Sequence, residues 1–259
     1  MSRLDVWLAE HGLAESREKA QALVMAGLVR VDGHTATKPG TRVRDGSNVS
    51  VAKGDAHVGR GALKLEGALE AFGVDPSGKV ALDVGASTGG FTETLLARGA
   101  RRVYAVDVGR GQLHERLRRD PRVVVRDRTN ARLLSPEVVP EPCGLAVMDV
   151  SFISVELILP ALRTVLAPGA EAIVLVKPQF EVGRAQVGRG GIVKEPALHL
   201  QALRRAAEAA QAAGYGVRAA CPSPVAGAAG NREFFLYLVP GERPLPGDEL
   251  LTLVRKAVG

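Results

Sequence analysis

The sequence predicts an α/β protein with two domains, a small α+β domain followed by a larger one built on a mostly parallel sheet. From about residue 62 onward, apolar strand-like runs alternate with helix-like segments over short connections, which favours parallel strands covered by helices on both faces. The first of these strands runs into a glycine-rich loop, a pattern typical of a nucleotide-binding corner. Polar, glycine-rich residues at 53–61 predict a linker, so we expect domains over 1–58 and 59–259.

The first 52 residues alternate short helices and short strands. Two leucines share one face of a helix expected over 3–11. A second helix is expected to begin after Ser16 as its N-cap and to end at Gly27. A strand over 28–31 precedes Asp32-Gly33, a dipeptide typical of hairpin turns. Further short strands are expected at Val43, Val49 and Val51.

In the larger domain, apolar runs predict strands and the segments between them predict helices. Ligands of such sheets bind beyond the carboxyl ends of the strands, so polar residues at those ends are candidate site residues. The expected strands cover 80–84, 103–107, 122–126, 145–149, 172–176, 217–221 and 234–239. The expected helices cover 63–72, 91–98, 111–118, 154–165 and 196–213, with a short amphipathic helix in the last 20 residues.

Charge and composition limit the classes of function. The net charge of +6, with a pI of about 9.6, favours a polyanionic partner. The segment 98–132 holds 11 arginines and 4 acids, a band that can follow phosphates or, alternatively, form an ordinary solvated surface. Two distant cysteines predict no disulfide framework, and scattered histidines predict no metal site. Without an apolar leader or an apolar run of about 18 residues, we expect a cytoplasmic monomer that does not enter membranes.

The stretch A-L-D-V-G-A-S-T-G-G-F, residues 81–91, is the strongest ligand signal in the chain. Its glycines let the backbone take positive φ and approach a ligand closely. Ser87 stands where the second glycine of G-x-G-x-x-G belongs, which argues against a dinucleotide site. The spacing D-x-G-x-x-x-G-G-F instead fits the loop that methyltransferases use for S-adenosylmethionine; a glycine-rich turn without a ligand is the alternative. The residues expected to bind the cofactor here are Asp83, Gly85, Ser87, Thr88, Gly89, Gly90 and Phe91.

Polar residues at the ends of the next two strands make the expected ligand more specific. Asp107 ends the second strand, where a carboxylate can accept both ribose hydroxyls of an adenosine. Asp127 follows the third strand and is expected to meet the adenine amine, with Asn130 nearby. Each acid alone is equally consistent with a surface or turn position. Their occurrence at successive strand ends favours an adenosine-bearing cofactor.

Two lysines and two acids at the ends of other elements suit methyl transfer to a hydroxyl. Asp149 ends the fourth strand, Lys177 ends the fifth, Glu233 begins the last strand, and Lys64 lies on the opening helix. A hydroxyl is a weak nucleophile, so it needs a base or a precise orientation. Lys177 is expected to take the proton and Asp149 to position that lysine, while Lys64 and Glu233 hold the nucleotide hydroxyl. Two ordinary salt bridges are the alternative interpretation.

These residues resemble the K-D-K-E tetrad of the FtsJ-like ribosomal RNA 2′-O-methyltransferases. The first 52 residues, with R-L-D-x-x-L, S-R-x-x-A and G-x-V-x-V-D-G, resemble the S4 RNA-binding domain, and the combination is similar to the TlyA family. The resemblance implies a Rossmann-like methyltransferase domain, S-adenosylmethionine as donor, and 2′-O-methylation of a cytidine in ribosomal RNA or a ribosomal subunit. It also implies RNA contacts by Arg3, Arg17, Lys19, Arg30 and Arg60.

The linker departs from the family pattern, and other functions remain open. Gly59 stands where serine is common, and His57 occupies an aromatic position. If the linker couples RNA docking to cofactor binding, that coupling differs in this chain. The competing functions are a non-catalytic factor for ribosome assembly, a membrane-lysing haemolysin and a small-molecule O-methyltransferase. The last of these leaves the S4-like segment and the arginine band unexplained.

Overall fold

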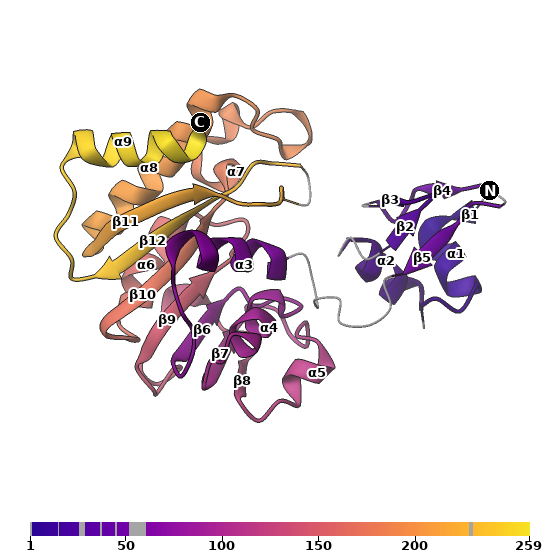
Figure 1. Ribbon diagram of the computed structural model, residues 1–259, viewed down its shortest axis with the longest axis horizontal. Coiled ribbons are helices and arrows are strands. Elements are labelled where there is room, and N and C mark those ends of the chain that lie inside the picture. Colours follow the sequence, from indigo (N-terminus) through magenta and orange to yellow (C-terminus); the bar gives the residue numbers. More distant parts are fainter. Residues whose placement is uncertain are drawn as a thin grey trace. The chain divides into compact units, whose positions relative to one another are not determined.

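The computed structural model describes residues 2–14, 16–25, 29–36, 38–44, 46–51, 61–227 and 230–259 (Figure 1). The chain divides into a first unit, Met1–Arg60, and a second unit, Gly61–Gly259. The domain boundary expected between residues 58 and 59 lies outside the described residues.

The described residues of the first unit form two helices and two small antiparallel sheets, β1-β4 and β3-β2-β5. The hairpin expected at Asp32-Gly33 is present: φ is 50° at Asp32 and 80° at Gly33, and β2 and β3 pair on either side. The predicted helix end at Gly27 lies outside the described residues. The elements are β1 (Ser2–Arg3), α1 (Leu4–Glu10), α2 (Arg17–Met25), β2 (Val29–Val31), β3 (His34–Thr35), β4 (Arg42–Val43) and β5 (Val49–Val51). Their buried core consists of Leu4, Leu8, Ala20, Val24, Val29, Ala36 and Val43.

The second unit is built on a seven-stranded sheet with the order β11-β12-β10-β9-β6-β7-β8. The pairs from β10 through β9, β6 and β7 to β8 are parallel, and β12 runs antiparallel to both of its neighbours. The predicted fold class, an α/β domain on a mostly parallel sheet, is therefore confirmed. The strands are β6 (Val80–Val84), β7 (Arg102–Val106), β8 (Val123–Arg126), β9 (Cys143–Met148), β10 (Leu166–Val176), β11 (Tyr215–Pro222) and β12 (Phe234–Pro240).

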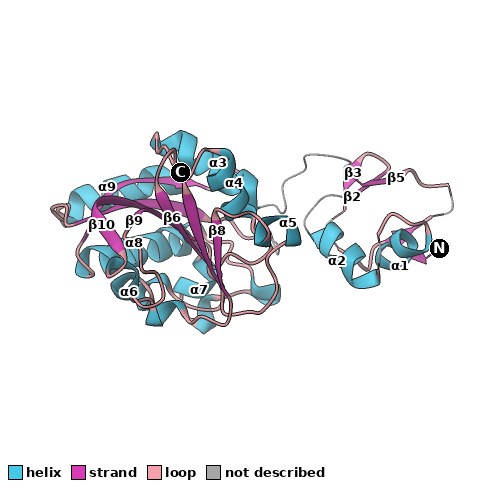
Figure 2. Cartoon of the chain, turned by 90° about the horizontal axis from the view of Figure 1, so that it is seen from below, coloured by secondary structure: helices cyan, strands magenta, loops and turns pink. Residues whose placement is uncertain are grey.

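Helices cover both faces of this sheet (Figure 2). On one face, α3 and α4 pack through ring contacts between Phe72 and Tyr237 and between Phe91 and Phe235. On the other face lie α6 and α8, with α9 packed against α8 and β11. The helices are α3 (Gly61–Phe72), α4 (Gly90–Ala97), α5 (Glu115–Arg118), α6 (Leu159–Arg163), α7 (Pro178–Glu181), α8 (Pro196–Ala212) and α9 (Gly247–Val258).

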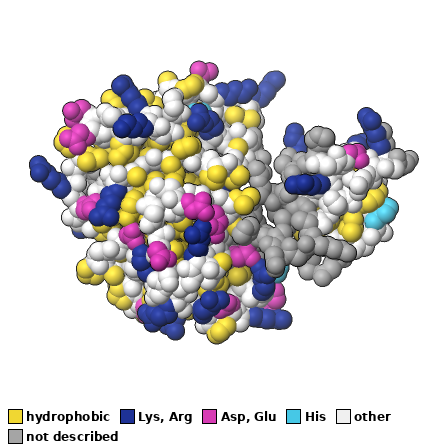
Figure 3. All heavy atoms as spheres, viewed as in Figure 1, with side chains coloured by type: hydrophobic (Ala, Val, Ile, Leu, Met, Phe, Trp, Pro, Cys, Tyr) yellow, Lys and Arg dark blue, Asp and Glu magenta, His cyan; other side chains and the backbone are white. Residues whose placement is uncertain are grey.

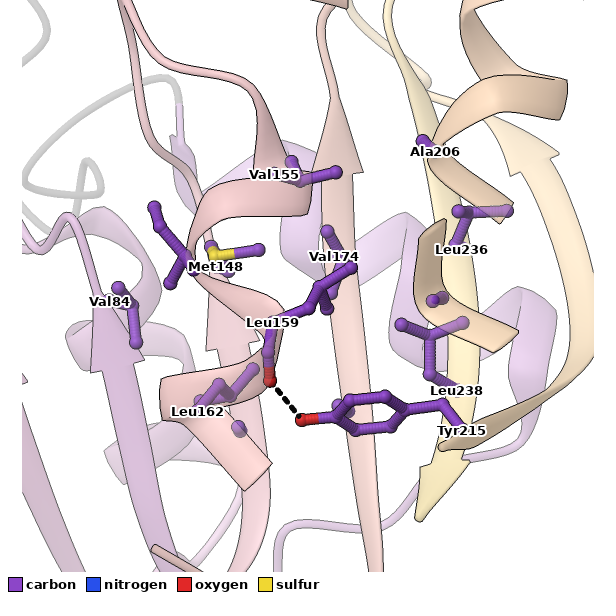
Figure 4. Packing of buried hydrophobic residues seen from close by; sticks show 14 of the residues in the cluster. Val84, Met148, Val155, Leu159, Leu162, Val174, Ala206, Tyr215, Leu236 and Leu238 are labelled. Atoms are coloured by element: carbon purple, nitrogen blue, oxygen red, sulfur yellow. Dashed lines mark hydrogen bonds between the residues drawn. The ribbon is translucent and has the colours of Figure 1, made fainter. Parts of the chain in front are cut away.

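The main core lies between the sheet and the α6/α8 face (Figure 4). Met148, Val174 and Leu236 project from three adjacent strands toward the leucines of α6 and the alanines of α8. The buried hydroxyl of Tyr215 donates a 3.0 Å hydrogen bond to the carbonyl of Leu159, so the ring fills the core without leaving its polar atom unsatisfied. This packing fixes the carboxyl ends of the central strands.

Two predicted helices are shorter than expected. The segment 111–118 is helical only from Glu115, because Gly111 has φ of 64° and His114 has the extended backbone of an N-cap, with its side chain accepting the N–H of Arg116. The segment 154–165 is divided into the 3₁₀ turn η2 (Val155–Leu157) and α6. Pro160 at the start of α6 has no N–H to donate and crowds the carbonyl four residues earlier, so the two pieces do not merge.

Candidate active site

The strand order of the sheet reverses between β6 and β9, which are neighbours. Ligands of open α/β sheets bind beyond the strand ends at such a switch point, so we place the candidate site there. The loop after β6 is held there by the N–H of Gly85, which donates to Val106 at 2.8 Å. Gly85 has φ of 84°, and a Cβ on it would lie 2.3 Å from the Asp149 carbonyl oxygen. Only glycine allows the two strand ends to approach this closely.

A cavity of about 460 Å³ opens at these strand ends. It is lined by Gly85, Ser87, Asp107 and Asn130, which are expected to bind the cofactor, and by Asp149, which is expected to act in catalysis. The carboxylate of Asp107 accepts N–H bonds from Ser87 at 2.8 Å and from Gly109 at 2.7 Å. A carboxylate has about four acceptor positions, so two remain for the hydroxyls of a ribose. The cavity therefore fits an adenosine-bearing ligand.

Asp83 lies beneath the cavity and is not part of its lining. Its side chain is fully buried on the α4 face of the sheet, and the Thr92 hydroxyl donates to Oδ2 at 2.6 Å. Burial, together with the charges of Asp149 and Asp107, raises the pKa of Asp83 to about 7. This acid supports the loop from behind.

Other predicted cofactor residues also lie outside the cavity lining. The carbonyl of Thr88 accepts an N–H from His114, while Gly90 begins α4 and Phe91 is buried against Phe235. Gly89 has φ of 105°, and a Cβ there would lie 2.2 Å from a methyl group of Leu117. These four residues shape the turn into α4.

Asp127 is also placed away from the lining, since its carboxylate accepts from Gly111 N–H and from Arg118. The Gly111 bond is the main cause that lowers the pKa of Asp127.

The four charged residues at the element ends form two close ion pairs. Nζ of Lys177 lies 2.5 Å from Oδ1 of Asp149 and donates to Oγ of Ser151 at 2.9 Å. Nζ of Lys64 lies 2.5 Å from Oε2 of Glu233, and both of those side chains are buried. Buried charges are stable only when paired in this way.

The topology explains how residues so distant in sequence share one edge of the sheet. The register pairs Val176 of β10 with Phe234 of β12, so Lys177 and Glu233 come next to each other just beyond the paired residues. Because β12 is reversed, its first residue lies at the edge where the parallel strands end. On the α3 side, a Cβ on Gly90 would lie 2.9 Å from the backbone N of Ala62, so the starts of α3 and α4 pack tightly.

An exposed aromatic residue at the cavity was not among the predicted site residues. Phe152 lines the cavity, is 90% exposed and has φ of 65°, an uncommon conformation for a bulky residue. Its ring tilts against that of Phe180, with centroids 5.1 Å apart. The signal available in the sequence was a phenylalanine three residues after the predicted end of a strand, in a chain with 4% aromatic residues.

In the first unit, two of the nominated arginines surround a buried acid. Arg3 donates through Nε and Nη2 to the two oxygens of Asp5 at 3.0 Å each, and Nε of Arg17 donates at 3.1 Å. Gln21 completes the set at 2.8 Å. The Arg3 bond is the largest cause that holds the pKa of Asp5 well below its usual range. Arg17 and Gln21 therefore join α2 to α1, and Arg3 joins β1 to the same acid.

The other nominated RNA contacts are Arg30, Lys19 and Arg60. Arg30 is exposed on β2. The side chain of Lys19 and the whole of Arg60 lie outside the described residues.

Most arginines of the 98–132 band are paired with acids. Arg98 bonds Glu66, and Arg101 and Arg102 both lie against Glu141, next to the amino ends of β7 and β9. Further pairs join Arg116 to Glu93, Arg118 to Asp127, Arg119 to Glu115, and Arg122 to Asp120. On the face drawn in Figure 3, basic and acidic side chains are interspersed over the second unit. The band is not a continuous row of free cations.

No helix in the described part of the chain is both long enough and apolar enough to cross a membrane.

Comparison with known proteins agrees with this geometry. The model of the FtsJ-like methyltransferase family matches residues 57–239, and the S4 domain model matches residues 2–49. The 16S/23S rRNA (cytidine-2′-O)-methyltransferase TlyA of Mycobacterium tuberculosis is 48% identical, over 99% of this chain and 97% of its own. Hemolysin A of Brachyspira hyodysenteriae is 38% identical, over 92% of this chain and 99% of its own.

Solved structures show the same fold. A chain from Streptococcus thermophilus that carries a hemolysin name superposes with a TM-score of 0.77 at 40% identity, covering 99% of this chain and 95% of that one. An S-adenosylmethionine-dependent methyltransferase from Listeria monocytogenes, 14% identical, shares the fold of the larger unit with a TM-score of 0.53. The protein is a methyltransferase, and its family implies the use of S-adenosylmethionine. The chain belongs to the FtsJ-like methyltransferase family, in the TlyA group that carries an N-terminal S4 domain.

Proposed function

We propose that the protein transfers a methyl group from S-adenosylmethionine to the 2′-hydroxyl of a cytidine in ribosomal RNA. The observation that carries the proposal is the pair of lysine–carboxylate contacts at the carboxyl-terminal edge of the sheet, Lys177 with Asp149, which lines the cavity, and Lys64 with Glu233. The substrate class is supported by the S4 match over residues 2–49 and by the activity named for the tuberculosis relative.

Gly85, Ser87, Asp107 and Asn130 are the residues proposed to hold the donor. The Asp107 carboxylate accepts the ribose hydroxyls, and Gly85 allows close backbone approach. When bound, S-adenosylmethionine supplies a methyl group on a positively charged sulfur. The buried Asp83 and the residues 88–91 keep the loop in shape, and Asp127 holds the neighbouring segment through Gly111.

The tetrad orients and activates the acceptor hydroxyl in this proposal. As a neutral amine, Lys177 Nζ would accept the hydroxyl proton while the hydroxyl oxygen bonds to the methyl carbon and the methyl–sulfur bond breaks, which releases S-adenosylhomocysteine. The ammonium that results lies 2.5 Å from Asp149, which stabilises it. Lys64, fixed by Glu233, donates to the same oxygen and holds it in line with the methyl group.

Phe152 is proposed to stack against the base of the target cytidine. A nucleotide that presents its 2′-hydroxyl inside a cavity must leave its own stack, and exposed aromatic rings support such bases. Phe152 is exposed at the cavity and braced by Phe180.

The phosphates of the RNA are proposed to lie along a set of cations that make no ion pair with any residue in the described ranges. All of them follow β7, β8 or β10, or precede β12, and so belong to the edge of the sheet that carries the tetrad. They are Arg110, Arg128, Arg132, Arg184, Arg189, Lys194 and Arg232. Such contacts supply affinity that falls with salt and carries no sequence preference.

The S4 domain, over 1–58, is proposed to dock on the same RNA through Arg30, Lys19 and the N–H groups of Arg3 and Arg17 that Asp5 leaves free, and Arg60, just after this domain, is proposed to contact it as well. The methyltransferase domain then covers 59–259, and the protein acts as a monomer on ribosomal subunits in the cytoplasm.

Methyl transfer from labelled S-adenosylmethionine to 16S and 23S RNA, free and in subunits, tests the proposal. Lys177→Ala should abolish incorporation, whereas Lys79→Ala, which removes another paired lysine at the amino end of β6, should not. Mapping 2′-O-methyl groups then identifies the cytidine. Binding without incorporation by the wild-type protein would favour an assembly factor. Methylation of small hydroxyl compounds alone, or leakage of liposomes at low protein concentration, would replace the proposal with a different activity.

A further inference from the structure

Glu181 is a buried acid that the proposed chemistry does not use. It ends α7, the four-residue helix that begins directly after Lys177, and it is 3% exposed. Its Oε2 accepts the hydroxyl of Ser154 at 2.7 Å, and its Oε1 accepts the N–H of Val155 at 2.9 Å. Both oxygens therefore bind the end of the loop that follows β9, the strand leading to Asp149.

Lys177 holds the beginning of the same loop. Its ammonium contacts Asp149 and Ser151, while Glu181, four residues later, contacts Ser154 and Val155. The N–H of Val182 donates to the carbonyl of Pro178, so Lys177 and Glu181 lie at the two ends of one hydrogen-bonded helical turn. The loop 149–155 is thus fixed at both ends by a single short helix.

The part of the loop between the two anchors carries the exposed ring. Phe152 has φ of 65° and leans on Phe180, which also comes from α7. A non-glycine residue keeps a positive φ only when its surroundings enforce it. Phe180 braces the ring from the side, and the two anchors fix the backbone, so α7 enforces this conformation at three points.

Burying the charged carboxylate of Glu181 costs free energy. Burial raises the pKa of Glu181, although its bonds to Ser154 and Val155 oppose the rise. Arg205 and Glu156 are the charged groups nearby. Charge-assisted bonds to an N–H and a hydroxyl are shorter and more directional than neutral ones, which suits a part that must hold a fixed geometry.

We infer that Glu181 is a positioning residue for methyl transfer: it fixes the loop 149–155 so that Asp149, Ser151 and Phe152 are held around the acceptor nucleotide. The inference rests on the proposed function. Residues 149–153 line the cavity proposed to hold the donor, and Gly85 packs against Asp149. The loss should therefore appear in turnover, in use of the RNA and in binding of S-adenosylmethionine.

Glu181→Ala and Glu181→Gln separate positioning from general stability. The glutamine keeps a carbonyl for the Val155 N–H and an amide that can donate to Ser154. We expect kcat of Glu181→Ala to fall about 10- to 100-fold, and that of Glu181→Gln to stay within about threefold of wild type. Glu171→Ala is the matched control, because Glu171 is a partly buried acid bound to Lys79 and Tyr237 away from the site, and its kcat should not change.

The rate of amide hydrogen exchange in residues 150–157 measures how firmly Glu181 holds the loop, and it does not depend on methyl transfer. Exchange should speed up in Glu181→Ala, recover in Glu181→Gln and stay unchanged in Glu171→Ala. Unchanged exchange, or wild-type kcat and KM in folded Glu181→Ala, overturns the inference. Absence of RNA methylation by the wild-type protein would refute the proposed function. The hydrogen-exchange result would still show whether Glu181 holds the loop. If Glu181→Ala does not fold, Ser154→Ala removes one of the two bonds and should show the same effects at smaller amplitude.

Discussion

Replacing Asp83 with asparagine should stabilise the second unit, increasingly so as pH rises. Asp83 is fully buried, its Oδ2 is bonded to Thr92, and its Oδ1 accepts no hydrogen bond from any residue that the structure describes. Desolvation, followed by the nearby charges of Asp149 and Asp107, raises its pKa from 3.8 to about 7. Asparagine has nearly the same shape and keeps an acceptor for Thr92, but it carries no charge to bury.

The sign and size of the effect follow from proton binding. Between pH 4 and pH 7 the folded protein keeps a proton on Asp83 that the unfolded chain releases, so the free energy of unfolding falls as pH rises through this range. A difference of roughly 3 pH units corresponds to about 4 kcal/mol, of which about 3 kcal/mol develops between pH 5 and pH 8.

Urea unfolding of wild type and Asp83→Asn at pH 5, 6, 7 and 8 measures this difference. The three tyrosines lie in the second unit and the single tryptophan, Trp7, in the first, so their signals separate the two transitions. Asp120→Asn is the control: it should lower the unfolding free energy instead of raising it, because the Arg122 hydrogen bond that lowers the pKa of Asp120 stabilises the charged carboxylate. Stability curves of wild type and Asp83→Asn that run parallel from pH 5 to pH 8 would refute the reasoning.

Three further changes test other parts of the structure. Glu233→Gln leaves its buried lysine partner without a carboxylate and should lower the unfolding free energy by about 3 kcal/mol, measured in urea. Gly85→Ala should weaken S-adenosylmethionine binding at least about tenfold by calorimetry, because its Cβ would lie 2.3 Å from a carbonyl; Gly111→Ala, also at positive φ but in open space, should cost stability alone. Arg128→Ala should reduce the salt dependence of RNA binding by about one counterion, whereas Arg101→Ala, an ion-paired arginine at the opposite edge, should leave it unchanged.

Much of the fold was predictable because the strands are continuous apolar runs. β6 was predicted at its observed bounds, and β7 and β12 to within one residue. The positions of the candidate site residues Asp107, Asp149 and Lys177 were predictable for a related reason: each follows a buried strand at its carboxyl end, and the topology gathers those ends at one edge. Local pattern and global topology agree in these places.

The side-chain partners were not predictable, because they depend on contacts between distant segments. Nothing near Arg101 or Arg102 in the sequence indicates that both meet Glu141, about 40 residues later. The role of Arg3 in holding Asp5 was likewise hidden, since an arginine near an acid is equally typical of a solvated surface. Glu181 gave no signal as an anchor for the loop after β9, since its partners come 26 and 27 residues earlier.

The reversed strand β12 also determines when the protein can be completed during synthesis. Although β12 comes last in the chain among the strands, it is not at the edge of the sheet but lies between β10 and β11. Until it emerges from the ribosome, β11 has no neighbour to pair with, and Lys64 waits for a partner 169 residues downstream. Such late, non-local contacts slow folding and leave apolar strand edges open in the meantime. A nascent chain that ends before residue 233 therefore has the glycine-rich loop after β6 but lacks the carboxylate that pairs with the buried Lys64.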